Sequence, residues 1–268
     1  MAHPDQYLPR PGNARVGNTG GGTFIPIGPR HAITANHVGV STGKIWIDGV
    51  GYRVRRTIPH PAGRDLKLIE ITGPPYFLDW SPLHDDPLSL TPGTPVHIGG
   101  WGRTTASPGN PCIPWGDVGE RWARNTIEGV VAPAAVVWYR FDAERSNEGI
   151  ATLFDSGSFL GVEDPDHCRL TLVGVATGSS NSTGPTCDGN AAYYLLIDDW
   201  VRQTARPICP GDLDADSDTD VLDFGILIKA LSQADGDCAR RSEGDLDMDG
   251  RVTILDFAFL ADDFGCVP

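Results

Sequence analysis

The chain has 268 residues, which is enough for one sizeable core with a small appendage or for two modest domains. Its 33 glycines and 22 prolines stand between short apolar runs, which indicates many turns and many short strands. The net charge of −14 is uneven, because the segment from Cys209 onward carries fifteen acidic and four basic residues. Such concentrated acid repels nucleic acid and membrane surfaces and attracts hard cations, so we expect no nucleic-acid partner.

The cysteine positions bear on the cellular compartment. There are six, at 112, 168, 187, 209, 238 and 266, without a Cys-x-x-Cys pair or a Cys/His cluster at zinc-ligand spacing. This favours structural disulfides in an oxidising compartment, with buried thiols in a cytosolic protein as the open alternative. No run approaches the ~20 apolar residues of a membrane span, and the first residues lack a signal-peptide pattern. We therefore expect a secreted or surface-attached protein whose signal peptide is not present in this chain.

Most of the first two hundred residues have the pattern of short strands separated by turns. Strands are predicted over 22–28, 31–38, 65–71, 96–103, 130–141, 170–178 and 191–197, loops over 105–127 and 179–190, and one amphipathic helix over 198–204. Acidic residues stand at the start of that helix, where its dipole favours negative charge. Many short strands closed by one helix suggest β-barrels rather than a parallel sheet.

Three separated residues are candidates for nucleophilic catalysis. Ser156 lies in the run Phe154-Asp155-Ser156-Gly157-Ser158, His37 has small neighbours that leave room for an imidazole to face a cleft, and Asp65 heads a strand. A serine hydroxyl needs a histidine to take its proton and a carboxylate to orient that histidine. Taken singly, each has a commoner explanation: a turn, a core histidine and a strand-capping aspartate.

In chain order, these three residues resemble the triad of the trypsin-like serine proteases, which have the chymotrypsin fold. The resemblance rests on four motifs and the strands around them: Thr34-Ala35-Asn36-His37, Asp65-Leu66-Lys67-Leu68, Gly99-Gly100-Trp101-Gly102 and Phe154-Asp155-Ser156-Gly157-Ser158-Phe159. It covers residues 13–205, after an N-terminal extension over 1–12. It implies a mainly β fold of two six-stranded antiparallel β-barrels.

The resemblance also implies roles for individual residues. His37 would be the general base and later the general acid, Asp65 would fix its tautomer, and Ser156 would attack a peptide carbonyl. The backbone N–H groups of Phe154 and Ser156 would form the oxyanion hole, typically worth ~3 kcal/mol per donor. A protein or peptide substrate would contact Ile150, Thr177 and Ser179.

Three of the aligned positions depart from the family pattern, and Asp155 carries a further expectation. Phe154 stands where the family has the oxyanion-hole glycine, so a positive φ there would strain the backbone. Ile150 stands where Lys/Arg-specific enzymes carry Asp, which predicts no preference for basic side chains. The family's cysteine beside the histidine is Val38 here. Asp155 is expected to have a partner other than a newly formed amino terminus.

The acidic tail contains one pattern twice, 33 residues apart. Twelve-residue loops begin at Asp212 and Asp245, and acids fill positions 1, 3, 5 and 12. This is the spacing of an EF-hand calcium loop, whose flexible oxygen ligands suit Ca²⁺ better than Mg²⁺, whereas a solvated acidic linker does not explain the repeat. Helix-patterned apolar residues follow each loop, at Phe224, Leu227, Ile228 and Leu231 and at Phe257, Leu260, Ala261 and Phe264.

Residues 209–268 resemble the dockerin module, because the loop is duplicated and ends in Asp rather than Glu. The resemblance implies two Ca²⁺ sites and a cohesin-like or other surface protein as partner. It carries ligand roles to Asp212, Asp214, Asp216 and Asp223 with the carbonyl of Asp218, and to Asp245, Asp247, Asp249 and Asp256 with the carbonyl of Arg251. Where many dockerins have Ser-Thr, the chain has Val221-Leu222 and Ile254-Leu255. These pairs are expected to face the core or an unfamiliar apolar surface.

Cys209 and Cys266 bracket this module and are candidates to staple its ends, while Cys168 with Cys187 and Cys112 with Cys238 are hypothetical pairs. The sequence as a whole predicts a secreted serine endopeptidase joined to a calcium-binding dockerin-like tail. Two alternatives stay open. One is a catalytically inactive protease fold that serves as a binding or adhesion module, and the other is a triad that hydrolyses esters or processes its own chain once.

Overall fold

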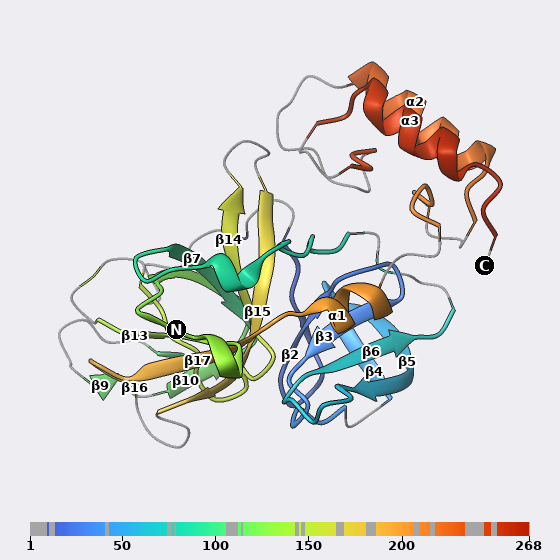
Figure 1. Cartoon of the computed structure of the whole chain (residues 1–268). Coiled ribbons are helices and arrows are strands. Elements are labelled where there is room, and N and C mark those ends of the chain that lie inside the picture. Colours follow the sequence, from blue (N-terminus) through green and yellow to red (C-terminus); the bar gives the residue numbers. More distant parts are fainter. Residues whose placement is uncertain are drawn as a thin grey trace.

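The computed structural model of the chain describes residues 10, 14–40, 43–73, 77, 79–105, 112–113, 115–142, 145, 148–164, 169–180, 186–205, 209–214, 218–233, 244–247 and 251–267. A closed barrel and a larger open sheet make up its β part, and a pair of helices follows at the C-terminal end (Figure 1). The mainly β architecture predicted from the sequence is therefore confirmed, with an α-helical tail.

The first barrel has six strands, closed in the order β1-β2-β3-β6-β5-β4 as predicted. The strands are β1 Gly17–Asn18, β2 Thr23–Pro26, β3 His31–Thr34, β4 Lys44–Ile47, β5 Val50–Pro59 and β6 Lys67–Ile71. Strand β1 pairs with both β2 and β4, which closes the cylinder. All five residues of β6 are buried, so the chain just before it, at Asp65, lies at the rim of a packed core.

The second β unit is a seven-stranded sheet, and the prediction of a second closed six-stranded barrel is wrong. Its order is β11-β7-β14-β15-β17-β13-β12, with β7 Pro95–Gly100, β11 Arg121–Thr126, β12 Gly129–Val131, β13 Val136–Arg140, β14 Phe159–Asp164, β15 Arg169–Ser179 and β17 Ala191–Leu196. The buried side chain of Asn125 on β11 donates to the carbonyls of Arg140 at 3.0 Å and Gly149 at 2.9 Å. A side-chain amide thus connects β11 to the end of β13, where closure would need paired backbone strands.

The predicted loop over 105–127 is also wrong in most of its described part. Strands β8 Arg103–Thr105 and β10 Trp115–Val118 form a two-stranded sheet, and β9 Cys112–Ile113 pairs with β16 Thr186–Cys187. Strand β11 buries Trp122 and Ala123. The abundant Pro, Gly and Asn of this stretch favour a loop in a sequence-based prediction, so they obscured the short strands. The predicted strand over 130–141 is likewise divided, by the 3₁₀ turn η3 Ala132–Ala134.

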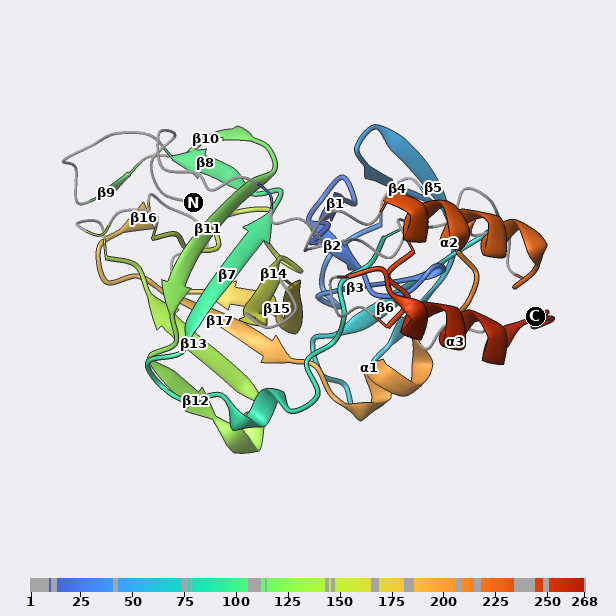
Figure 2. The same ribbon diagram turned by 90° about the horizontal axis from the view of Figure 1, so that it is seen from above.

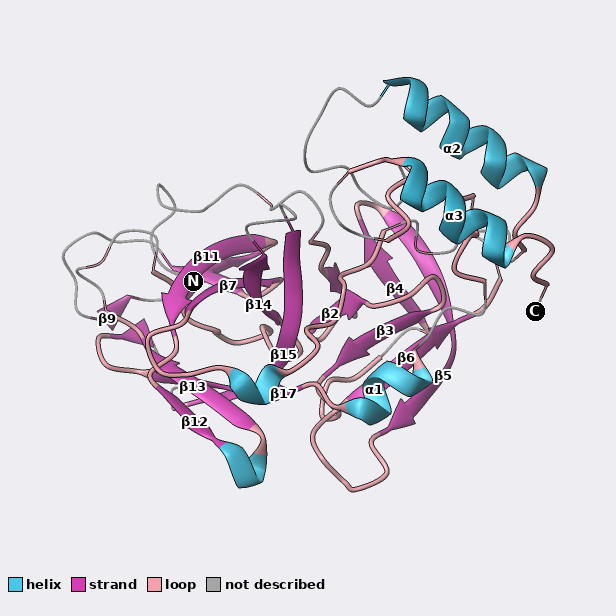
Figure 3. Ribbon diagram, turned by 45° about the horizontal axis from the view of Figure 1, so that its top comes forward, coloured by secondary structure: helices cyan, strands magenta, loops and turns pink. Residues whose placement is uncertain are grey.

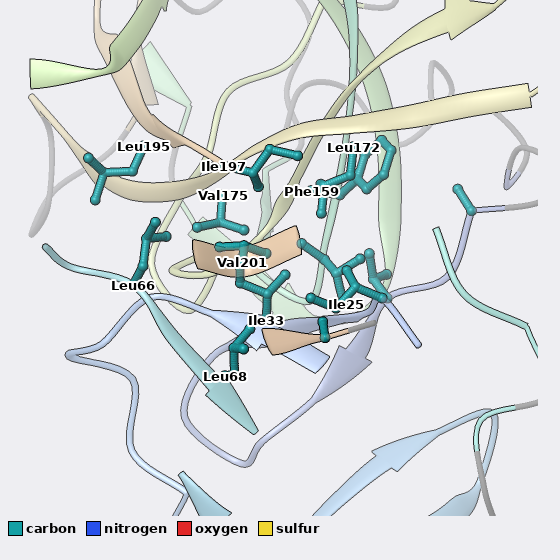
Figure 4. Close-up of a cluster of buried hydrophobic side chains, with 14 of the residues drawn as sticks. Ile25, Ile33, Leu66, Leu68, Phe159, Leu172, Val175, Leu195, Ile197 and Val201 are labelled. Carbon is teal, nitrogen blue, oxygen red and sulfur yellow. The ribbon is translucent and has the colours of Figure 1, made fainter. Parts of the chain in front are cut away.

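Helix α1 Asp199–Thr204 follows the sheet as predicted, and the Asp198 side chain caps it by accepting from the backbone N–H of Val201. The Asp198 carboxylate also contacts His60 Nε2, at 2.8 Å, and the Arg64 guanidinium. Val201 enters a core that joins the barrel to the open sheet (Figure 4). Besides Val201, the side chains labelled in that view are Ile25, Ile33, Leu66 and Leu68 from the barrel side and Phe159, Leu172, Val175, Leu195 and Ile197 from the sheet side.

The C-terminal helices α2 Val221–Gln233 and α3 Ile254–Asp263 lie alongside each other (Figures 2 and 3). Leu227 and Leu260 on the helices pack with Leu213 and Leu246, which occupy position 2 of each predicted loop. The expected helices are confirmed, and of their patterned apolar residues Ile228, Phe257, Ala261 and Phe264 are exposed. None of the helices in the described ranges has the length and hydropathy of a membrane-spanning segment.

Candidate functional site

The three predicted triad residues lie together at the junction of the barrel and the sheet. His37 Nε2 is 2.7 Å from Ser156 Oγ, and His37 Nδ1 is 2.7 Å from Asp65 Oδ2. His37 is exposed, while Asp65 and Ser156 are partly buried. This chain of contacts lets the imidazole take the serine proton while the carboxylate holds the Nδ1–H tautomer.

Local backbone structure positions the histidine. Strand β3 ends at Thr34, and a turn closed by the hydrogen bond from Val38 N to Ala35 O, 3.1 Å, presents His37 to solvent. Asp65 holds this turn twice, because its Oδ1 accepts from the backbone N–H of His37 at 2.9 Å while its Oδ2 faces the ring. The carboxylate therefore fixes both the backbone and the ring of His37.

Thr177, predicted as a substrate contact, directs its hydroxyl to this carboxylate. Its Oγ1 donates to Asp65 Oδ2 at 2.5 Å. The register of β15 against β17 shifts between Ala176 and Gly178, so Thr177 occupies a β-bulge. A bulge redirects one side chain out of the regular alternation of a strand. The bulge thus allows a residue of the open sheet to orient the aspartate of the barrel.

The Ser156 turn is fastened to the barrel by strand β2. The backbone N–H of Thr23 donates to Ser156 O at 2.9 Å, and Thr34 Oγ1 donates to Thr23 O at 2.6 Å. Gly157 has φ +82°, and a Cβ there would lie 2.2 Å from Thr34 Oγ1. Glycine is therefore required after the nucleophile, both for the backbone conformation and for the close approach of β2.

Asp155 is fully buried, and Thr152 is its hydrogen-bond partner among the described side chains. Its Oδ2 accepts from the backbone N–H of Thr152 at 2.8 Å and from the Thr152 hydroxyl at 2.9 Å. Burial raises the pKa of Asp155, while hydrogen bonds from Thr152 and from the backbone of Gly102 act in the opposite direction. A Cβ at Gly102 would lie 2.0 Å from Asp155 Oδ2, and one at Gly100 would lie 2.4 Å from Oδ1. The glycines of the Gly-Trp-Gly motif thus make room for this carboxylate.

Phe154 adopts φ +74°, the conformation that a glycine would favour. The strain anticipated from the sequence is therefore present in the backbone. Thr23 Oγ1 lies 3.4 Å from Phe154 O and accepts from Trp101 N at 2.9 Å, which ties this peptide to β2 and β7. Within the described part of the chain, the backbone N–H groups of Phe154 and Ser156 donate no hydrogen bond.

Replacing Phe154 by glycine should preserve this backbone, because glycine adopts the same φ without steric cost. We expect the Phe154→Gly protein to be more stable than Phe154→Ala by about 1 kcal/mol, since alanine retains the penalty of a Cβ at positive φ. The two variants both lose the ring, which lies 5.7 Å from the Arg103 guanidinium, so their difference isolates the backbone term. Urea unfolding measures it. An alanine variant at least as stable as the glycine variant contradicts the assigned conformation.

The other predicted substrate contacts have different surroundings. Ile150, predicted at the floor of a specificity pocket, is 1% exposed and packs in the core of the open sheet with Tyr139 and Tyr194. Ser179 is partly buried at the end of β15. The expected lack of preference for basic side chains stays a prediction.

The acidic side chains of the tail converge in two groups that correspond to the predicted loops. One ligand oxygen each from Asp212, Asp214 and Asp223 lies within 4.8 Å of the others, and Asp245, Asp247 and Asp256 form the matching group. Calcium binds oxygens at about 2.3–2.6 Å, so three oxygens this close fit around one ion. Since three carboxylates repel each other at this spacing, the donor set fits a divalent cation. Asp216 and Asp249, predicted as ligands, lie outside the described residues.

The last aspartate of each loop also organises its backbone. Asp223 Oδ1 accepts from Leu213 N at 2.5 Å and Asp223 Oδ2 from Asp220 N at 2.8 Å. Asp256 repeats this, accepting from Leu246 N at 2.6 Å and from Thr253 N at 2.6 Å. Asp220, which the sequence reasoning missed, caps α2 and lies in an acidic group with Asp218 and Asp223. Asp220 stands at position 9 of the first loop, which is a ligand position in EF-hand loops, and this spacing could have identified it. The ligand roles predicted for the carbonyls of Asp218 and Arg251 stay predictions.

A disulfide between Cys209 and Cys266 joins the two ends of the tail, as predicted, with a Cα–Cα distance of 5.7 Å. The Asp263 carboxylate reinforces the junction by accepting from Gly211 N at 2.5 Å and from Thr219 Oγ1 at 2.7 Å. Cys187 is disulfide-bonded and stands opposite Cys112 in the β9–β16 pair. Cys168 and Cys238 lie outside the described residues.

Comparison with known proteins identifies one part of the chain. Residues 210–264 match the family described as Dockerin type I domain. The match lies inside the predicted range 209–268 and confirms a dockerin domain there. No curated protein matches the chain.

Proposed function

We propose that the β part of this chain is a serine endopeptidase. The observation that carries the proposal is the continuous contact from Asp65 through His37 to Ser156, with both His37 contacts at 2.7 Å. Two backbone N–H groups without an acceptor among the described residues, those of Phe154 and Ser156, support it as oxyanion donors.

The reaction begins with attack of Ser156 Oγ on a peptide carbonyl while His37 Nε2 takes the hydroxyl proton. The oxygen of the tetrahedral intermediate accepts from the N–H groups of Phe154 and Ser156. His37 then gives its proton to the leaving amine, and the acyl group stays on Ser156 until water, activated by the same imidazole, releases it. Asp65 stabilises the imidazolium in both steps, and Thr177 keeps that carboxylate in place.

A fluorophosphonate probe tests the proposal, because it labels a serine only when that serine is activated. We expect stoichiometric labelling of the full chain, loss of labelling in Ser156→Ala, and cleavage of denatured protein added in trans. Ser89→Ala serves as the matched control, because it removes an exposed serine hydroxyl that is not part of the triad. A folded, calcium-loaded chain that takes no label contradicts the proposal and favours an inactive binding module. Labelling without cleavage in trans favours an esterase or a single self-processing event.

We further propose that the tail binds two Ca²⁺ ions and attaches the enzyme to a cohesin partner outside the cell. The dockerin match, the two convergent carboxylate groups and the Cys209–Cys266 disulfide support this assignment. Val221, Leu222, Ile254 and Leu255 are all more than half exposed, so positions 10 and 11 of both loops offer apolar side chains to a partner. An apolar contact of this kind is expected to be less sensitive to salt than a polar one.

A further inference from the structure

Lys67 is a buried cation that the proposed reaction does not use. It is the first residue of β6, two positions after Asp65, and it is only 8% exposed. Among the described residues it forms no ion pair. Burial lowers the pKa of its ammonium group, and the negative charge of Asp65 acts in the opposite direction. A buried charge is costly, so its hydrogen bonds indicate what it does.

The Lys67 ammonium donates to the two carbonyls on either side of the histidine. Nζ lies 3.0 Å from Asn36 O and also bonds Val38 O. Within the described part of the chain, no backbone N–H donates to either carbonyl. Lys67 is therefore the described group that donates to the carbonyls of both neighbours of His37. Hydrogen bonds from a charged donor are about twice as strong as neutral ones.

Asp65, which lies just before β6, and Lys67, the first residue of β6, thus hold the same turn through groups of opposite charge. Asp65 binds the N–H and the ring of His37, while Lys67 binds the carbonyls before and after it. Val38, where the resemblance would place a cysteine, packs instead against Gly22, since a Cβ built there would lie 2.8 Å from Val38 Cγ1. The turn therefore has no covalent anchor at Val38, and Lys67 supplies a polar one.

We propose that Lys67 is a positioning residue that holds the imidazole of His37 within reach of Ser156. This inference rests on the proposed serine-protease function, because it concerns the geometry of the same triad. Lys67 does not contact the substrate, so its effect falls on the chemical step. Misplacing a reacting group by about 1 Å costs on the order of 10²-fold in rate.

The test compares Lys67→Met with Lys44→Met, which removes the same charge from an exposed position on strand β4 of the barrel. We expect Lys67→Met to lower kcat for peptide hydrolysis by about 10- to 100-fold with KM unchanged. Lys44→Met should match the unaltered chain. If Lys67→Met does not fold, Lys67→Gln is measured in its place, and it should lower kcat in the same way. Unchanged kcat in whichever variant folds overturns the inference.

A spectroscopic readout separates this inference from the enzymatic proposal. The proton that His37 Nδ1 donates to Asp65 gives a low-field NMR signal in the folded protein, whether or not the chain turns over substrate. We expect this signal to weaken or broaden in the Lys67 variant and to persist in Lys44→Met. A chain that hydrolyses nothing but loses the signal in Lys67→Met contradicts the protease and supports the positioning role. An unchanged signal in Lys67→Met overturns the positioning role alone.

Discussion

The Asp65→Asn variant is expected to lose about 10³- to 10⁴-fold in kcat while remaining folded. The amide oxygen of asparagine can accept from the backbone N–H of His37, as Asp65 Oδ1 does at 2.9 Å. Its NH₂ group then faces His37 Nδ1 and donates to it. The imidazole is thereby held with its proton on Nε2, so it cannot accept the proton of Ser156. Steady-state hydrolysis of a peptide substrate measures the loss.

The matched control for this experiment is Asp86→Asn, which makes the same exchange at an exposed position. Its kcat should equal that of the unaltered chain, and both variants should have unchanged circular dichroism. Raising the pH increases the share of hydroxide and is expected to restore part of the Asp65→Asn rate. Full activity of Asp65→Asn at neutral pH is incompatible with the role of His37 as general base.

The sequence predicted the three triad residues of this site better than the residues that hold them in position. His37, Asp65 and Ser156 stand in short local motifs, and the structure brings them together. The contact of Thr177 with Asp65 depends on a β-bulge, and bulges follow from the register between strands rather than from composition. The contact of Lys67 depends on the backbone carbonyls of Asn36 and Val38, which lie 31 and 29 residues earlier in the chain. No pattern of side chains in the sequence predicts such a contact with the backbone.

The same distinction explains the errors in the fold. Most of the short strands and the two acidic loops of the tail followed from local signals, and so did the Cys209–Cys266 disulfide, whose residues bracket one module. The closed first barrel was implied by the family resemblance. Closure of the second sheet depends on long-range pairing, and there the amide of Asn125 makes the connection instead. Gly100 and Gly102 were recognised as part of a motif. The reason why glycine is needed at both positions is visible only in the fold, where the Asp155 carboxylate packs against them. Motifs formed by residues close together in the sequence were therefore predictable, whereas contacts between distant residues were not.

Removing Ca²⁺ with EDTA is expected to unfold helices α2 and α3 while the β part stays folded. Within each loop, ligand oxygens from three aspartates lie within 4.8 Å, and without a cation their mutual repulsion opposes folding. A cation at one hundred times its Kd stabilises the tail by about 2.7 kcal/mol per site. The disulfide limits the loss, because closing a loop of 57 residues contributes about 4 kcal/mol in the chain-entropy description. Loss of helical circular dichroism, reversed by added Ca²⁺, measures the effect.

Single substitutions assign the two ions to the two loops. Asp223→Asn and Asp256→Asn each remove one charge from one group, and calorimetric titration should then find one Ca²⁺ site weakened at least 10-fold and the other unchanged. Asp262→Asn, on the exposed side of α3, controls for the loss of negative charge and should titrate normally. Binding to an immobilised cohesin should fall with EDTA, while labelling of Ser156 should persist, because the triad lies on the barrel and the open sheet. If EDTA abolishes labelling as well, the catalytic part depends on calcium and the two functions are coupled.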